Sequence, residues 1–180
     1  MKSLLTLIAL LLAFQVQAVS IGVDTGKSFS SLNGSSTVKP GNPLLLGGEW
    51  LLPHEGDVRY AGALQASYLI SNHFFHVIPS LRASYVSFTH QPAGYVLSPG
   101  IGIIWPVAEK AWLFADYHFA PDTLTYRMHR YEDMRLGVGL APGRALHLQA
   151  GYRTLTLDGQ HGHRDRSLTD GWFIGARYLF

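Results

Sequence analysis

Residues 171–180 read GWFIGARYLF, and this closing stretch decides the fold. Counted back from the end, every second side chain is apolar: Phe180, Tyr178, Ala176, Ile174 and Trp172. The positions between them include Gly175 and the charged Arg177. An alternation of period two over about ten residues predicts a β-strand long enough to cross a bilayer at a tilt. The strand therefore predicts a membrane-spanning β-barrel, provided that the rest of the chain alternates in the same way.

A strand of alternating aromatic and apolar residues that ends in Phe resembles the C-terminal signature of bacterial outer-membrane β-barrels. The resemblance implies that the barrel-assembly machinery is a partner and that it reads the last strand. It also implies outer-membrane lipid around the barrel. The implied assembly signal consists of four residues: Trp172, Ile174, Tyr178 and Phe180.

The N-terminus has the three parts of a secretory signal peptide. Lys2 gives a short positive region, residues 4–14 are an apolar run, and small residues lead to Ala18. We place the cleavage after Ala18, so that residues 1–18 are the signal peptide and residues 19–180 form the barrel. The apolar run is too short to span a membrane as a helix.

Composition limits the function classes. The chain is 47% hydrophobic and only 14% charged, yet the mature part has no uninterrupted apolar run of about 18 residues, so no transmembrane helix is expected. Without Lys2 the 14 basic residues become 13 against 12 acidic ones, which offers no basic patch for nucleic acid. There is no Cys, so a thiolate site is excluded, and we expect no cofactor.

Alternating segments recur along the whole chain. From residue 44 onward there are eight: 44–52, 58–70, 77–88, 95–105, 111–119, 133–140, 145–157 and 171–180. The segments 19–24 and 28–36 add two more. Both totals are even, as is usual for bacterial barrels, and the short turns at 71–74, 106–110 and 141–144 are expected to face the periplasm together with the C-terminus. The fold class is thus an all-β transmembrane antiparallel up-and-down β-barrel. We expect it to be a monomer in the outer membrane.

A soluble periplasmic β-barrel or sandwich is the rival fold. It would bury the Leu, Tyr and Trp faces and expose the Arg, Gln and His faces. The low charge content and the aromatic residues near strand ends favour the membrane barrel, because aromatic rings gather at membrane interfaces. Leu136 and Leu148 are then expected to face lipid, and Arg135 and Arg153 the lumen.

Three segments carry a resemblance to a known family. Residues 113–124, LFADYHFAPDTL, resemble the LFAEYHYAPDSL-type segment of the YfaZ family, and residues 150–153 resemble its AGYRY segment. Residues 159–165, GQHGHRD, resemble its GKDGNRD loop, with His161 and His163 in place of Asp and Asn. The resemblance covers residues 95–180 well. It implies an outer-membrane protein and brings no ligand, reaction or catalytic residue.

The number of strands is the most open part of the prediction. Residues 28–36 make a weak strand, because their two large apolar side chains, Phe29 and Leu32, fall on opposite faces. An eight-stranded barrel would close residues 44–52 against residues 171–180. The resemblance implies two patterned strands in the N-terminal region, so we prefer ten strands and keep eight as the alternative.

The face assigned to the lumen collects charged and polar side chains: Glu49, Arg59, Gln65, Arg82, Asp116, His118, Arg135, His147, Gln149, Arg153 and Arg177. A barrel of eight to ten strands has a narrow interior, and buried charges must be paired. We interpret these residues as a lumen charge network in a structural or interaction-mediating protein. The alternative is a narrow, anion-favouring channel for small solutes, because five Arg meet few acids.

A lipid-modifying outer-membrane enzyme is a third possibility. Small barrels that deacylate lipid A carry a His-x-Ser pair, and none of the nine His here precedes a Ser by two residues. We therefore expect no enzymatic activity. The segment from Asp158 to Asp165, with His161 and His163, has side chains that bind divalent metals, but we expect a solvated loop and no metal site.

Overall fold

The structure is a computed structural model that describes residues 19–38, 41–158 and 166–180. The predicted signal peptide, residues 1–18, lies outside the described residues, and so do His161 and His163 of the predicted loop. No helix in the described ranges is both long and apolar enough to cross a membrane.

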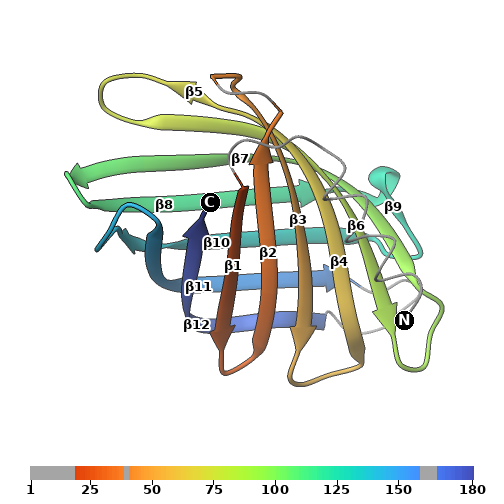
Figure 1. Ribbon diagram of the computed structural model, residues 1–180. Helices are drawn as coiled ribbons and strands as arrows, with labels where there is room; N and C mark the ends of the chain where they lie inside the picture. The colour runs from red at the N-terminus through yellow and green to blue at the C-terminus, as the bar shows by residue number, and fades with distance from the viewer. Residues whose placement is uncertain (1–18, 39–40, 159–165) are drawn as a thin grey trace.

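Ten long strands form the wall of a closed barrel (Figure 1). They are β1 (Val19–Gly26), β2 (Phe29–Thr37), β3 (Leu44–Pro53), β4 (Val58–Tyr68), β6 (His76–Phe88), β7 (Gly94–Ala108), β8 (Ala111–Ala120), β10 (Arg130–Leu140), β11 (Leu146–Asp158) and β12 (Arg166–Leu179). The short strands β5 (Ile70–Ser71) and β9 (Thr125–Tyr126) and the 3-10 turn η1 (Asp122–Leu124) lie in connections. Every long strand pairs antiparallel with its neighbours along the chain, and β1 closes the barrel by pairing with β12.

The ten-strand prediction is confirmed, and the eight-strand alternative is wrong. β3 pairs with β2 and β4, while β12 pairs with β1 and β11. The weak pattern of β2 has a physical reason. Its inward face belongs to the polar lumen, where Ser31 is buried and Asn33 donates a hydrogen bond to Asp24 at 3.0 Å. Leu32, on the other face, is exposed on the outside of the barrel.

The outside of the barrel is apolar, the reverse of a soluble barrel. Leu64, for example, is 70% exposed and Ile174 is 66% exposed. A row of aromatic rings runs across five neighbouring strands, with ring centroids 4.6 to 6.3 Å apart: Trp50, Tyr60, Tyr85, Tyr95 and Tyr126. Apolar side chains outside and aromatic rings at one level are what a lipid bilayer requires.

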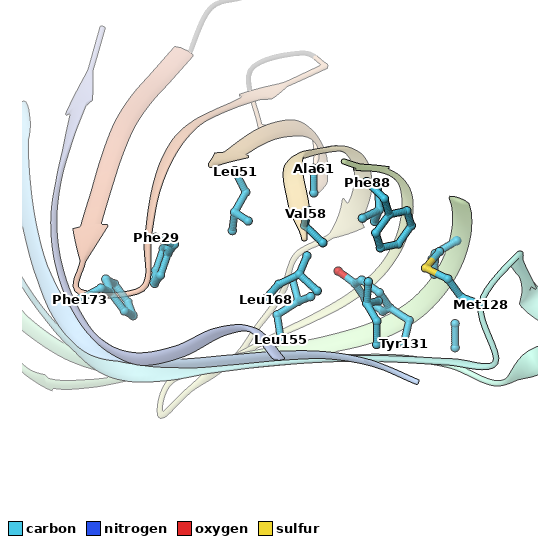
Figure 2. Close-up of a cluster of buried hydrophobic side chains, with 14 residues drawn as sticks. Phe29, Leu51, Val58, Ala61, Phe88, Met128, Tyr131, Leu155, Leu168 and Phe173 are labelled. Atoms are coloured by element: carbon cyan, nitrogen blue, oxygen red, sulfur yellow. The ribbon is translucent and has the colours of Figure 1, made fainter. Parts of the chain in front are cut away.

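The two rims of the barrel differ in what fills them. We call the rim that carries Val19 and Phe180 the terminal end; there the Phe180 N–H donates to the Val19 carbonyl oxygen at 2.9 Å. The opposite rim, which carries the β1–β2, β3–β4 and β6–β7 turns, is the loop end. Inside the loop end, fourteen buried apolar side chains form an apolar plug: Phe29, Leu51, Val58, Ala61, Val86, Phe88, Val96, Ala120, Met128, Tyr131, Leu155, Leu157, Leu168 and Phe173. Figure 2 shows these side chains converging across the barrel interior from opposite walls.

One predicted facing is wrong. β4 and β6 shift register between Val58 and Tyr60, which marks a β-bulge. A bulge adds one residue to one strand and reverses the faces on one side of it. Val58 therefore points into the apolar plug, while Arg59, which we expected in the lumen, is exposed.

Candidate functional site in the lumen

Four charged side chains form a ring of ion pairs in the middle of the lumen. Arg153 binds Glu49 with both terminal nitrogens, Nη1 to Oε1 at 2.5 Å and Nη2 to Oε2 at 2.9 Å. It also donates from Nε and Nη2 to Asp133, at 3.0 and 2.9 Å. Arg82 completes the ring, with Nη1 2.6 Å from Asp133 Oδ2 and Nη2 3.6 Å from Glu49 Oε2. We call these four residues the ion-pair ring.

The ion-pair ring joins walls of the barrel that do not pair with each other. Glu49 comes from β3 and Arg82 from β6, whereas Asp133 and Arg153 come from β10 and β11 on the opposite side (Figure 1). All four side chains are largely buried, with 3 to 14% of each accessible. Charges at such depth are tolerated only when they are paired and hydrogen-bonded, and bidentate Arg–carboxylate contacts are the strongest of these. The ring therefore ties the barrel together across its lumen.

A second cluster surrounds Asp24 of β1. Its carboxylate is 1% accessible and lies 2.9 Å from Arg135 Nη2. Asn33 donates to it at 3.0 Å, and Gln149 donates to it as well. The Arg135 guanidinium also lies over the ring of Phe173, 4.7 Å from its centroid. Asp24 thus has its acceptor positions occupied by three strands of the wall.

Further charged and aromatic groups lie beside these clusters and toward the terminal end: His118 is the register partner of Asp133, and His147 that of Arg177. Buried His118 shares a hydrogen bond of 2.9 Å between Nε2 and Ser80 Oγ. The ring of His147 lies 4.9 Å from that of Trp112. Asp116 is opposite Arg135 in register, without an ion pair within 4.0 Å among the described residues. His118 thus pairs with Ser80, but among the described residues no carboxylate is hydrogen-bonded to either His, so the third member of a catalytic triad is missing.

A cavity of about 230 Å³ occupies the lumen from the ion-pair ring toward the terminal end. Polar and charged side chains from many strands line it, together with Trp112 and Phe114. A second cavity, of about 10 Å³, lies beside the apolar plug between Leu51, Tyr131 and Leu155. This volume is about that of a single water position. The lumen is therefore roomy in its terminal half and filled in its loop half.

Nine Arg, His and acidic residues were expected in the charge network, and the structure brings eight of them together. These line the large cavity: Glu49, Arg82, Asp116, His118, Arg135, His147, Arg153 and Arg177. Arg59 does not, because of the bulge in β4. Sequence reasoning missed Asp24 and Asp133 as members. The alternation could have placed both in the lumen, because Asp24 is on the same face as Gly22 and Asp133 is two residues before Arg135, which was expected to face inward.

The four residues of the expected assembly signal lie on the outside of β12 and just after it. Trp172, Ile174, Tyr178 and Phe180 are all exposed, and the Tyr178 and Phe180 rings meet edge to face at 4.9 Å. They contribute nothing to the lumen. Within the described ranges, no three His, Asp or Glu side chains gather in a way that would hold a metal ion.

Comparison with known proteins places this barrel among outer-membrane proteins. The model of one family, described as "YfaZ precursor", matches residues 1–180. The curated "Outer membrane protein YfaZ" of Escherichia coli (strain K12) is 30% identical over 173 residues, which are 95% of this chain and 93% of that protein. Among solved structures, the "KdgM porin" aligns with a TM-score of 0.52 at 11% identity, over 91% of this chain and 99% of that one. A second structure of that porin, with disordered oligogalacturonate, gives 0.51.

Proposed function

Because this chain belongs to the YfaZ family of outer-membrane β-barrel proteins, we propose that it serves the outer membrane as a closed barrel, structural or interaction-mediating, and does not conduct solutes. The observation that carries the proposal is the apolar plug, which fills the lumen at the loop end with fourteen buried side chains. A hydrated path for ions needs polar walls along its whole length, and the side chains of the plug are apolar except for the Tyr131 hydroxyl, which donates to Asp133. The likeness to a porin is a likeness of fold.

The charges of the lumen support the same proposal. Among the residues that the structure describes, four Arg face the lumen together with four carboxylates: Arg82, Arg135, Arg153 and Arg177 with Asp24, Glu49, Asp116 and Asp133. Their formal charges cancel. The excess of Arg that suggested an anion-favouring channel came from counting Arg59 and omitting Asp24 and Asp133. The ion-pair ring and the Asp24–Arg135 pair hold six of these eight charges in contacts across the lumen, so that most of the Arg charge is neutralised where it lies.

The relatives and fold neighbours are named as outer-membrane proteins and porins, and none of these names is that of an enzyme. We therefore assign the protein no reaction. We also propose that it is a monomer in outer-membrane lipid, with the barrel-assembly machinery reading the row of Trp172, Ile174, Tyr178 and Phe180.

Conductance in planar bilayers tests the proposal. The folded mature protein should give no unitary steps, whereas a variant that replaces Leu51, Tyr131 and Leu155 by Ser should, because it removes three large side chains from the plug and leaves small polar ones. Steps from the unaltered protein, with an anion preference, would replace our proposal by the channel alternative. An exterior control, with Leu64 and Leu136 replaced by Ala, should remain silent, since both side chains face lipid.

A further inference from the structure

One guanidinium in the lumen has no anion. Arg82, Arg135 and Arg153 each have a carboxylate oxygen within 2.9 Å, but no carboxylate of the described residues lies within 4.0 Å of Arg177. Its Nη2 reaches only Asn33 Oδ1, at 3.5 Å, and its Nε is buried without a hydrogen-bond partner. Buried donors without partners are rare in folded proteins, because each loses its hydrogen bonds to water without replacement. Arg177 thus has donors free for an acceptor that the described part of the chain does not supply.

Two acids of the lumen, Asp24 and Asp116, do not supply that acceptor. Asp24 is already engaged by Asn33, Arg135 and Gln149. Asp116 lines the same cavity but stays beyond ion-pair distance of Arg177. The β1 side of Arg177 is closely packed, so the space for a ligand lies toward the large cavity that Arg177 lines. Gly22 is its partner in register on β1, and a Cβ there would come within 2.6 Å of Asn33 Oδ1 and 3.3 Å of Arg177 Cβ.

The wall next to Arg177 suits an organic solute. His147 is the register partner of Arg177 on β11, and its ring meets that of Trp112 at 4.9 Å. The Trp112 ring covers Gly139, so closely that a side chain at Gly139 would overlap it. The cavity that these residues share, at about 230 Å³, exceeds the 150 Å³ or so that admits benzene in an engineered protein. A guanidinium, an imidazole and an indole therefore border one space of ligand size.

We propose that this cavity binds a small organic anion, with a carboxylate or phosphate group on Arg177 and the remaining atoms against Trp112. The ligand enters from the terminal end, because the apolar plug fills the loop end. Binding needs no path through the barrel. The binding experiment and the conductance experiment therefore test separate proposals, and failure of one does not decide the other.

The fluorescence of Trp112 reports directly on anions that enter this cavity. The other three Trp, namely Trp50, Trp105 and Trp172, are exposed on the outside of the barrel, so replacing them by Phe leaves one indole that faces the lumen. The folded single-Trp protein in detergent is titrated at constant ionic strength with iodide, caesium and neutral acrylamide. Iodide should quench Trp112 several-fold more strongly than caesium does, because Arg177 concentrates anions beside it. Acetate and inorganic phosphate are then added as competitors, and protection by one or the other tells a carboxylate site from a phosphate site.

The matched variants are Arg177→Gln and Arg144→Gln. Arg144 is exposed in the β10–β11 turn at the same end, so its replacement removes an equal charge outside the cavity. Arg177→Gln should reduce iodide quenching several-fold and leave acrylamide quenching unchanged, whereas Arg144→Gln should alter neither. Equal loss in the two variants, or no protection by either competitor, would overturn the site. A second measurement replaces Arg177→Gln as the test if that variant does not fold. In the protein that keeps Arg177, a quenching constant of Trp112 for iodide no larger than that for caesium would equally overturn the proposed site.

Discussion

Removing Arg153 is the sharpest test of the ion-pair ring. Its guanidinium makes four hydrogen bonds to Glu49 and Asp133, so Arg153→Met takes four charge-assisted contacts away at once. Asp133 keeps Arg82 at 2.6 Å, but Glu49 is left with Arg82 at 3.6 Å, too far for a hydrogen bond. Removing one partner of a buried ion pair costs about 3–5 kcal/mol, since the other charge stays buried without compensation. We expect a loss of that size in the free energy of unfolding.

The control is a matched exposed pair on the same barrel. Arg130 contacts Glu132 at 2.8 Å, with half of the Arg130 side chain accessible, so Arg130→Met should cost less than about 1 kcal/mol. Adding Glu49→Gln to Arg153→Met should recover part of the loss, because the uncompensated charge disappears. The free energy of unfolding of the unaltered protein and of the three variants is measured by urea unfolding in lipid vesicles. Unfolding is followed by Trp fluorescence and by the compact band on an unheated gel. Similar losses in the two Arg variants, or no recovery in the double variant, would refute the reasoning.

Three further outcomes follow from the facing and the register. Leu148→Arg, on the lipid side, should destabilise the barrel more than Gln149→Arg on the lumen side, by up to about 4 kcal/mol at the bilayer midplane in the same urea assay; equal tolerance would contradict the assignment of faces. Deleting Phe180 should lower the amount of heat-modifiable barrel in the outer membrane while export continues, and normal amounts would remove Phe180 from the assembly signal. Cysteines at Val23 and Ala176, which are register partners where β1 meets β12, should cross-link on mild oxidation, and failure to do so in the folded protein would argue against this closure.

Alternation along each strand was enough to predict which side chains face lipid and which the lumen. Leu136 and Leu148 are exposed outside and Arg153 is buried inside because a strand reverses its face at every residue. Arg59 shows where this reasoning fails. A single bulge changes the count, and nothing in the sequence from Val58 to Tyr60 marks its position.

The pairing of charges across the lumen was beyond the reach of the sequence. Glu49 and Arg153 are 104 residues apart, and which of the lumen acids meets which Arg depends on strand register and on how opposite walls approach. The eight- and ten-strand closures place Glu49 differently around the barrel. The same dependence explains why Asp24 was missed as a partner of Arg135: its segment, 19–24, was one of the two that the eight-strand alternative leaves out of the barrel.

The wall of this barrel is uneven in height. β1 and β2 have 8 and 9 residues, whereas β6 and β7 have 13 and 15. At about 3.3 Å per residue and a tilt of about 45°, eight residues rise about 19 Å and fifteen about 35 Å. The apolar band of an outer-membrane barrel is about 25 Å tall, so the wall at β1 and β2 falls short of it while the wall at β6 and β7 exceeds it. Such mismatch is met by thinning of the bilayer or by tilting of the protein. We therefore expect the surrounding bilayer to be thinnest beside β1 and β2, next to the seam where β1 meets the 14-residue β12.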